Sequence, residues 1–121
     1  ILTGMMTYGS LPICDYYGDT NPACALVWGH HPSVSGTDGE LQVWIQEAVK
    51  RGTRLIVVVP RRTDLAEKAE IWLRIRPGAD DALALSMMNV IINGGLYDRA
   101  FVEEWTVGLD RLEERVQQYP P

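Results

Sequence analysis

The sequence predicts an α/β fold with a three-layer, mostly parallel sheet of Rossmann-like, doubly wound topology. Short continuous apolar runs occupy Ala25–Trp28, Leu55–Val59 and Ile71–Ile75. Segments with helical periodicity separate these runs and follow the last of them. Strands that alternate with helices are typical of βαβ units, in which the crossovers are right-handed and the strands parallel.

The first strand is predicted at Ala25–Trp28, where Pro22 and Gly29 bound a run that reads as buried on both faces. A loop is expected from Gly29 to Thr37. A helix is then predicted from about residue 38 to residue 51, capped by Thr37 or Asp38 and stopped by Gly52. Its apolar residues share one face at helical spacing: Leu41, Trp44, Ile45, Ala48 and Val49.

The clearest strand is Leu55–Val59, which is β-branched and ends at Pro60, since proline cannot donate to a sheet ladder. A short helix capped by Thr63 is expected to run to residue 69, before the third strand. A helix that is apolar nearly all round, and therefore expected to be buried, runs from Asp80 or Asp81 to about residue 93. Two further surface helices are predicted at 98–105 and 110–118.

Composition fits one small globular domain, with 46% hydrophobic and 22% charged residues in 121. Residues 1–24 are rich in glycine and proline and are expected to be irregular, with a short helical turn near 1–8, so the domain is placed at 25–121. The chain begins at Ile1 rather than methionine and stops at Pro121, which suggests a piece of a larger protein.

Charge and hydropathy exclude two classes of partner. The net charge is −5, and basic residues are mixed with acidic ones, whereas nucleic-acid binding needs a concentrated basic surface. No apolar run reaches the roughly 18 residues that span a bilayer, so direct membrane insertion is not expected. Cys14 and Cys24 are too few for a disulfide framework and are predicted to be small buried or half-buried side chains, although a disulfide between them stays open.

A ligand is expected at the carboxyl ends of the strands, where open parallel sheets bind their ligands. Trp28–Ser35, Val59–Thr63 and Arg76–Asp80 lie there. The first offers backbone N–H groups to a phosphate, the second offers Arg61, Arg62 and Thr63, and the third offers the Asp80 carboxylate to a guanine edge. The alternatives are an ordinary turn at Gly29, a solvated arginine pair, and a plain helix cap at Asp80.

No catalytic residue and no metal ligand are predicted. Adjacent histidines such as His30 and His31 point apart, and no third ligand follows at useful spacing. The usual dinucleotide, P-loop and nucleophile-elbow motifs are absent. The acidic pairs at 103–104 and 113–114 fall on predicted surface helices. The residues therefore predict binding rather than catalysis by the isolated chain.

The same segments resemble the molybdopterin oxidoreductases of the dimethyl sulfoxide reductase family. The resemblance lies in WGHHPSVS at Trp28–Ser35, LIVVVPRRTDLAEKAE at Leu55–Glu70, IRPGADDALALSMMNVII at Ile75–Ile92 and GLYDRAFVEEWTVGLDRL at Gly95–Leu112. It implies a cofactor-binding segment of an enzyme that carries molybdenum or tungsten on two molybdopterin guanine dinucleotides and performs two-electron redox chemistry. The segment would hold the nucleotide end of one dinucleotide, with no cofactor expected in the isolated chain.

The resemblance also implies the contacts. The cofactor-binding residues it indicates are Trp28, Gly29, His30, His31, Pro32, Ser33, Val59, Arg61, Arg62, Thr63, Gly78 and Asp80. Three positions depart from the family pattern: His31 stands where asparagine is common, Val59 where an acidic or polar residue is common, and Ala79 where threonine is frequent. The family's iron–sulfur cysteines and metal ligand lie upstream of this region, and Cys14 is not assigned to the metal.

The partners implied are the remaining domains of the larger enzyme and, as a further candidate, an iron–sulfur electron-transfer subunit. The resemblance places such enzymes in the bacterial or archaeal cytoplasm or periplasm. Two alternatives stay open: a self-contained Rossmann-like module that binds a nucleotide or flavin, and an interaction module without a ligand.

Overall fold

The computed structural model describes residues 21–35 and 40–121, and these fall into two compact units. The first unit ends at Leu73 and the second runs from Arg74 to Pro121. The expectations for residues 1–20, and for a helix cap at Thr37 or Asp38, lie outside the described residues.

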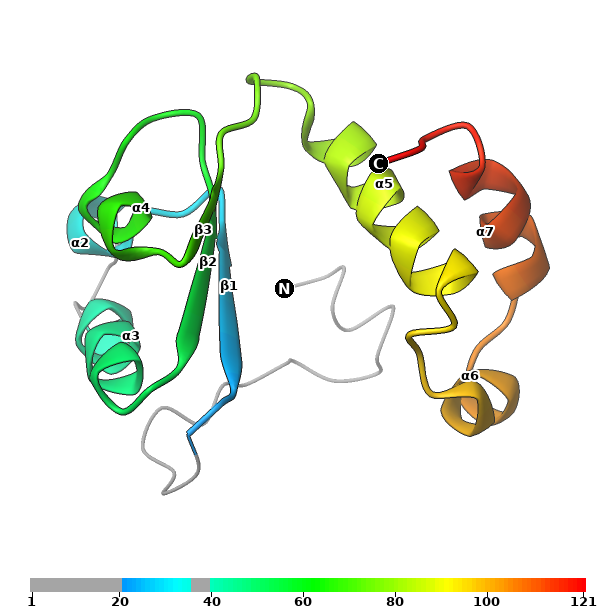
Figure 1. Cartoon of the computed structure of the whole chain (residues 1–121), viewed down its shortest axis with the longest axis horizontal. Helices are drawn as coiled ribbons and strands as arrows, with labels where there is room; N and C mark the ends of the chain where they lie inside the picture. The colour runs from blue at the N-terminus through cyan, green and yellow to red at the C-terminus, as the bar shows by residue number, and fades with distance from the viewer. Residues whose placement is uncertain (1–20, 36–39) are drawn as a thin grey trace. The chain divides into compact units, whose positions relative to one another are not determined.

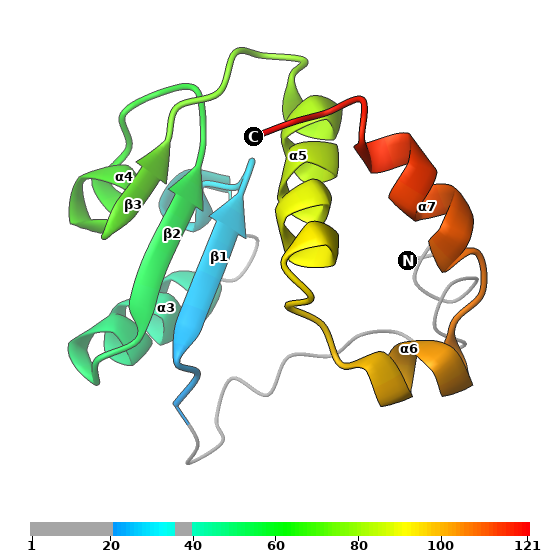
Figure 2. The same cartoon turned by 45° about the vertical axis from the view of Figure 1, so that its right-hand side comes forward.

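The first unit contains a three-stranded parallel sheet in the order β1-β2-β3, formed by β1 (Cys24–Trp28), β2 (Arg54–Val58) and β3 (Ile71–Leu73). Trp28 pairs with Val58, and Val58 pairs with Leu73, so the carboxyl ends of the strands meet at one edge of the sheet (Figure 2). The α/β class and the parallel sheet predicted from the sequence are confirmed.

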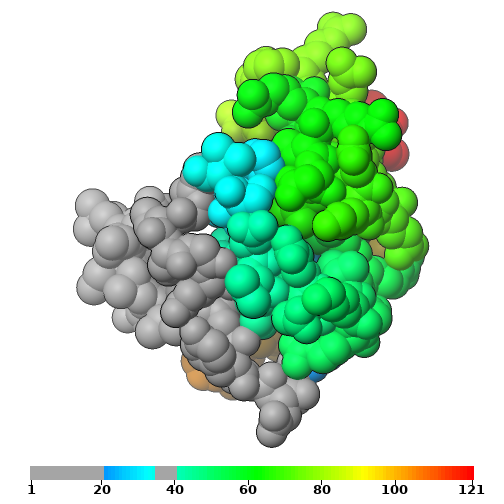
Figure 3. Space-filling view, turned by 90° about the vertical axis from the view of Figure 1, so that its left-hand side faces the viewer, coloured from blue at the N-terminus to red at the C-terminus, as the bar shows by residue number. Residues whose placement is uncertain are grey.

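Helices α2 (Pro32–Ser35), α3 (Glu40–Lys50) and α4 (Asp64–Lys68) connect these strands and lie on one side of the sheet (Figure 1). In the space-filling view of that side, they cover the strands (Figure 3). The prediction of a continuous loop from Gly29 to Thr37 is wrong at α2. Proline fits the first position of a helix, and four residues are too few to show a helical period.

The core of this unit lies between the sheet and its helices. Val27, Leu55 and Val57 point from the sheet toward Ile45 of α3 and Leu65 of α4, and all five are at most 7% exposed. Alternation along the strands places these side chains on one face. Leu41, Trp44, Val49 and Trp72 pack around the same cluster. This packing fixes the strand ends from which the candidate site is built.

The opposite face of β1 is more open than the sequence predicted. Leu26 is 47% exposed, and the free thiol of Cys24 is exposed as well. Both predictions of burial are wrong here. The two side chains alternate with those of the core, and β1 is an outer strand of the sheet, so they point away from α3 and α4.

The second unit is built from α5 (Asp80–Asn93), α6 (Arg99–Trp105) and α7 (Leu109–Val116). α7 packs against α5, and Asn89 Nδ2 donates to the Val116 carbonyl oxygen at 2.8 Å. Asn89 is 7% exposed, whereas Met88 and Ile91 of α5 are 40% and 39% exposed. The prediction that α5 is buried all round is therefore wrong, because one packed helix covers only part of its surface.

Candidate functional site

Two of the predicted cofactor segments lie side by side at the ends of β1 and β2. The backbone N–H of Gly29 donates to the Val58 carbonyl oxygen at 2.9 Å, directly beyond the paired residues Trp28 and Val58. The segments Trp28–Ser33 and Val59–Thr63, which we call the carboxyl edge, therefore start from adjacent points. The segments are far apart in the sequence, and the parallel pairing of β1 with β2 brings them together.

A polar contact joins the two segments further along. His31 Nε2 lies 2.8 Å from Asp64 Oδ1, and the Ser33 hydroxyl donates to the same oxygen at 3.3 Å. Asp64 is the first residue of α4, 33 residues after His31. The hydrogen bond from His31 is the main cause that lowers the pKa of the Asp64 carboxyl below its usual range, with smaller contributions from the backbone of Leu65 and from Ser33.

The three predicted residues after β2 have different surroundings. The guanidinium of Arg62 forms an ion pair with Glu67 at 3.1 Å. The Thr63 hydroxyl accepts the backbone N–H of Ala66 at 3.1 Å and so caps α4. Arg61 is exposed and has no ion-pair partner among the described residues. Arg61 is thus the basic side chain of this segment that is available to an anion.

Gly29 and Val59 differ in their exposure to solvent. Gly29 is exposed, its φ of +62° favours glycine, and a Cβ there would meet open space. Val59 is 6% exposed and packs in the core, while its carbonyl oxygen accepts the indole N–H of Trp72 at 3.0 Å. The valine side chain that departs from the family pattern therefore belongs to the packing of the sheet.

The other predicted residues of the first segment lie close to the protein body. Trp28, His30, His31 and Ser33 are half-buried, and Pro32 is buried. α2, which starts at Pro32, is only four residues long. The dipole of so short a helix is small, so any anion bound here would depend mainly on individual donors.

Gly78 and Asp80 belong to the second unit. Gly78 is exposed with a φ of +84°, in the turn before α5, and Asp80 is the exposed first residue of that helix. Ala79 occupies the cap position and makes no side-chain cap, so Asp80 is not the N-cap of α5. That Asp80 and the carboxyl edge serve one ligand remains a prediction.

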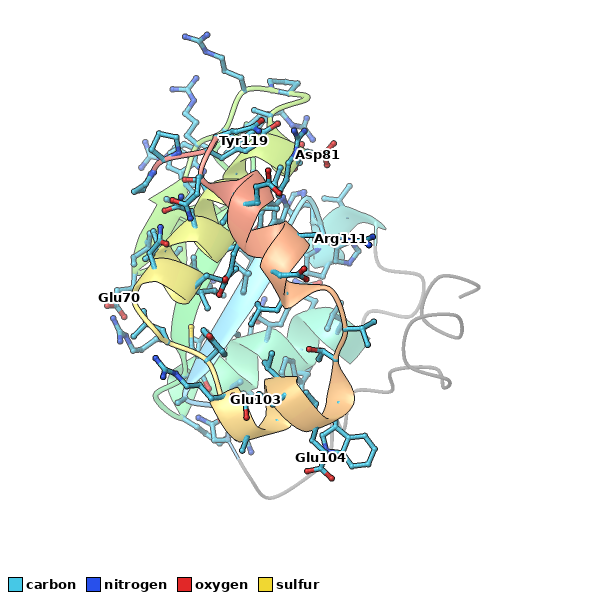
Figure 4. The ribbon with its side chains drawn as sticks, turned by 90° about the vertical axis from the view of Figure 1, so that its right-hand side faces the viewer. Glu70, Asp81, Glu103, Glu104, Arg111 and Tyr119 are labelled. Atoms are coloured by element: carbon cyan, nitrogen blue, oxygen red, sulfur yellow. The ribbon has the colours of Figure 1, made fainter. Side chains whose placement is uncertain are left out.

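Within residues 21–35 and 40–121, no group of three or more histidine, cysteine, aspartate or glutamate side chains could hold a metal ion. Glu103 and Glu104 are exposed on α6 (Figure 4). In the same described ranges, no helix is long and apolar enough to cross a membrane.

Sequence reasoning missed Asp64 and Trp72, which form hydrogen bonds with residues of the carboxyl edge. Asp64 lies between Thr63 and an apolar helix face, where an acidic residue reads as an ordinary helix start. Trp72 reads as a strand residue. The only available signal was that Asp64 follows β2 and Trp72 belongs to β3, two strands that end at the same edge of the sheet. This signal does not identify the residue with which each forms a hydrogen bond.

Comparison with known proteins matches the chain to segments of longer proteins. No family model matches the chain. Acetylene hydratase of Syntrophotalea acetylenica is 59% identical over 115 residues, which cover 95% of this chain and 15% of that protein. The alpha subunit of F420-dependent formate dehydrogenase from Methanocaldococcus jannaschii is 40% identical over 127 residues, which cover 99% of this chain and 18% of the relative.

Two further comparisons agree with these. The molybdopterin-containing subunit of thiosulfate reductase from Salmonella typhimurium is 36% identical over 77 residues, 64% of this chain and 10% of that protein. The solved structure of acetylene hydratase from Pelobacter acetylenicus matches 96% of this chain and 15% of its own length, with 44% identity and a TM-score of 0.82. This chain is therefore homologous to one segment of the molybdopterin-containing oxidoreductases, the family that its sequence motifs resemble.

Proposed function

We propose that this chain binds the nucleotide end of a molybdopterin guanine dinucleotide at its carboxyl edge. The observation that carries the proposal is that two parallel strands end side by side, so that the loops after them start from adjacent points. Open parallel sheets bind nucleotides outside the carboxyl ends of their strands. The chain would thus orient a cofactor whose metal-bearing end lies in other parts of a larger protein.

The chemistry of the donors fits an anionic nucleotide. Phosphate oxygens only accept hydrogen bonds, and the Arg61 guanidinium is exposed with no ion-pair partner in the described ranges. Gly29 leaves open space beside the backbone, which permits a close approach by a ligand. When bound, the cofactor supplies the metal chemistry, and this chain's residues bind and orient it.

Measurement of bound nucleotide in the whole protein tests this proposal. The purified protein is denatured in acid, and the released guanine nucleotide and the molybdenum or tungsten are quantified. We expect both to be present in the wild type, and Arg61→Ala to lower the nucleotide content. Arg111→Ala, which removes an exposed arginine from α7, is the control and should leave it unchanged. A fully active protein without guanine nucleotide and metal would refute the proposal.

The reaction that the whole protein catalyses needs a separate test. Redox chemistry at the metal is proposed from the family, but the relative with 59% identity is named a hydratase, whereas another is named a dehydrogenase. Assays with acetylene in the absence of an electron acceptor, and with formate in its presence, separate the two. Product from acetylene alone would favour hydration, and acceptor reduction by formate would favour two-electron oxidation.

The chain spans 15% of the acetylene hydratase that it matches, so its first partners are proposed to be the other domains of its own protein. An iron–sulfur electron-transfer subunit is proposed as a further partner, in a bacterial or archaeal cytoplasm or periplasm. Co-purification followed by iron analysis of the whole protein tests this proposal, and an iron-free preparation with full activity would contradict it.

A further inference from the structure

One carboxylate oxygen forms hydrogen bonds with two side chains of the carboxyl edge. Asp64 Oδ1 lies 2.8 Å from His31 Nε2 and 3.3 Å from the Ser33 hydroxyl. The side chain of His31 is 25% exposed and that of Asp64 is 44% exposed. Hydrogen bonds to a charged carboxylate are stronger than neutral ones.

These contacts add to the backbone hydrogen bonds of the loop that follows β1. Gly29 is fixed by its backbone hydrogen bond to Val58, and the next backbone bond, from Val34 N–H to the His31 carbonyl, is internal to the segment. The bonds from His31 and Ser33 to Asp64 therefore tie the far end of the loop to α4. They link residues that are 33 and 31 positions apart in the sequence.

We propose that Asp64 is a positioning residue for the cofactor: it holds His31 and Ser33 so that the loop from Gly29 to Ser33 keeps one conformation. This inference rests on the proposed function of the carboxyl edge. The His31 and Ser33 side chains contact Asp64, and the loop backbone together with Arg61 meets the nucleotide. An ordered loop avoids the entropic cost of fixing it when the ligand binds.

The test uses the whole protein and two measurements. Hydrogen–deuterium exchange follows the amides of residues 29–34, and acid release followed by chromatography gives the guanine nucleotide content. The variants are Asp64→Ala, Asp64→Asn, His31→Ala and the double variant Asp64→Ala/His31→Ala. Asp110→Ala, which removes an exposed acid from the first turn of α7, is the control.

We expect Asp64→Ala to accelerate exchange at residues 29–34 several-fold and to lower nucleotide content several-fold. His31→Ala should do the same, and the double variant should be no worse than the more severe single variant, since both remove one contact. Asp64→Asn keeps an acceptor and should recover most of the nucleotide. Asp110→Ala should match the wild type in both measurements.

Three outcomes would overturn the inference. Unchanged exchange in Asp64→Ala would show that the contact does not order the loop. Faster exchange with wild-type nucleotide content would show a structural role only. Independent, multiplying losses in the double variant would show that His31 acts without Asp64. A wild type that holds no guanine nucleotide would defeat the proposed function instead, and the exchange measurement would still decide whether Asp64 orders the loop.

Discussion

At the scale of single residues, two neighbours at the carboxyl edge make different kinds of contact. Thr63 caps its own helix through a local bond to Ala66, whereas Asp64 binds His31 across the loop. The local contact follows from the sequence, because threonine before an apolar helix is a cap signal. The distant contact does not, since it depends on how two strands are paired.

Replacement of Thr63 by alanine tests the local contact. Thr63→Ala removes the acceptor for the Ala66 N–H and should lower the free energy of unfolding by about 1 kcal/mol. Thr63→Ser keeps a hydroxyl and should retain most of this stability. Denaturant titration of the 121-residue chain measures both variants, and equal losses in the two would show that the hydroxyl bond contributes nothing.

The Asp64 contact predicts a dependence of stability on pH. The pKa of Asp64 is lowered from its ordinary value of 3.8, chiefly by the hydrogen bond from His31. A lowered pKa means that the contact stabilises the fold fully above the unfolded value and that this contribution disappears as the pH falls below it through the folded value.

Denaturation of the wild type and of Asp64→Asn at pH 7 and at pH 3 isolates this contribution. Glu47 and Glu70, whose pKa values are lowered by Lys50 and Arg54, titrate in the same acidic range and are present in both proteins. We expect the difference in unfolding free energy between the two proteins to shrink toward pH 3. A difference that is constant or grows in acid would contradict the assigned cause.

At the scale of elements, the sheet depends on the central strand β2. Val57 is 0% exposed and pairs with both Val27 and Trp72. Val57→Ala removes two buried methyl groups and leaves a small cavity, which should cost about 2 kcal/mol. Val43→Ala is the control, because Val43 is 61% exposed on α3. Thermal or denaturant unfolding compares them, and similar losses would show that burial does not decide the effect.

A chain of amide side chains joins α5 to α7. Asn89 donates to the Val116 carbonyl at 2.8 Å and accepts from Asn93 at 3.0 Å, and Gln117 donates to Asn93 at 3.1 Å. Asn89→Ala leaves a buried acceptor unpaired and should cost about 1–3 kcal/mol. Asn93→Ala, at an exposed position, should cost less, and exchange rates of α7 amides measure both. The reverse order would refute the dependence on burial.

The elements show what local patterns can and cannot predict. The β-branched run at Leu55–Val59 predicted β2 to within one residue, because a buried parallel strand needs little beyond such a run. The helix α2 was missed, since PSVS has no period, and α5 was overestimated, since an apolar sequence does not state how much of it is covered. The burial of Val59 and the contacts of Asp64 depend on packing between elements that are far apart in the sequence. A short stretch of sequence does not contain this information.

At the scale of the whole molecule, we propose that the described chain contributes cofactor positioning to a larger protein. Its carboxyl edge offers donors, and the described ranges hold no cluster of residues that could bind a metal. The relatives that it matches are several times longer, since the chain covers 10% to 18% of each. The parts beyond this segment are therefore proposed to supply the metal-bearing end and the substrate site.

Substitutions of two adjacent aspartates, Asp80 and Asp81, test the role of the second unit. The resemblance assigns Asp80 to the guanine base, because a carboxylate can accept two N–H donors from the guanine edge. Asp80→Ala in the whole protein should therefore reduce the guanine nucleotide retained after dialysis. Asp81→Ala removes a neighbouring exposed carboxylate from the same first turn and should retain the wild-type amount. Equal retention by both variants would show that guanine is not recognised through Asp80. Equal loss from both would mean that the charge of the first turn of α5, and not a directed contact, is what the nucleotide senses.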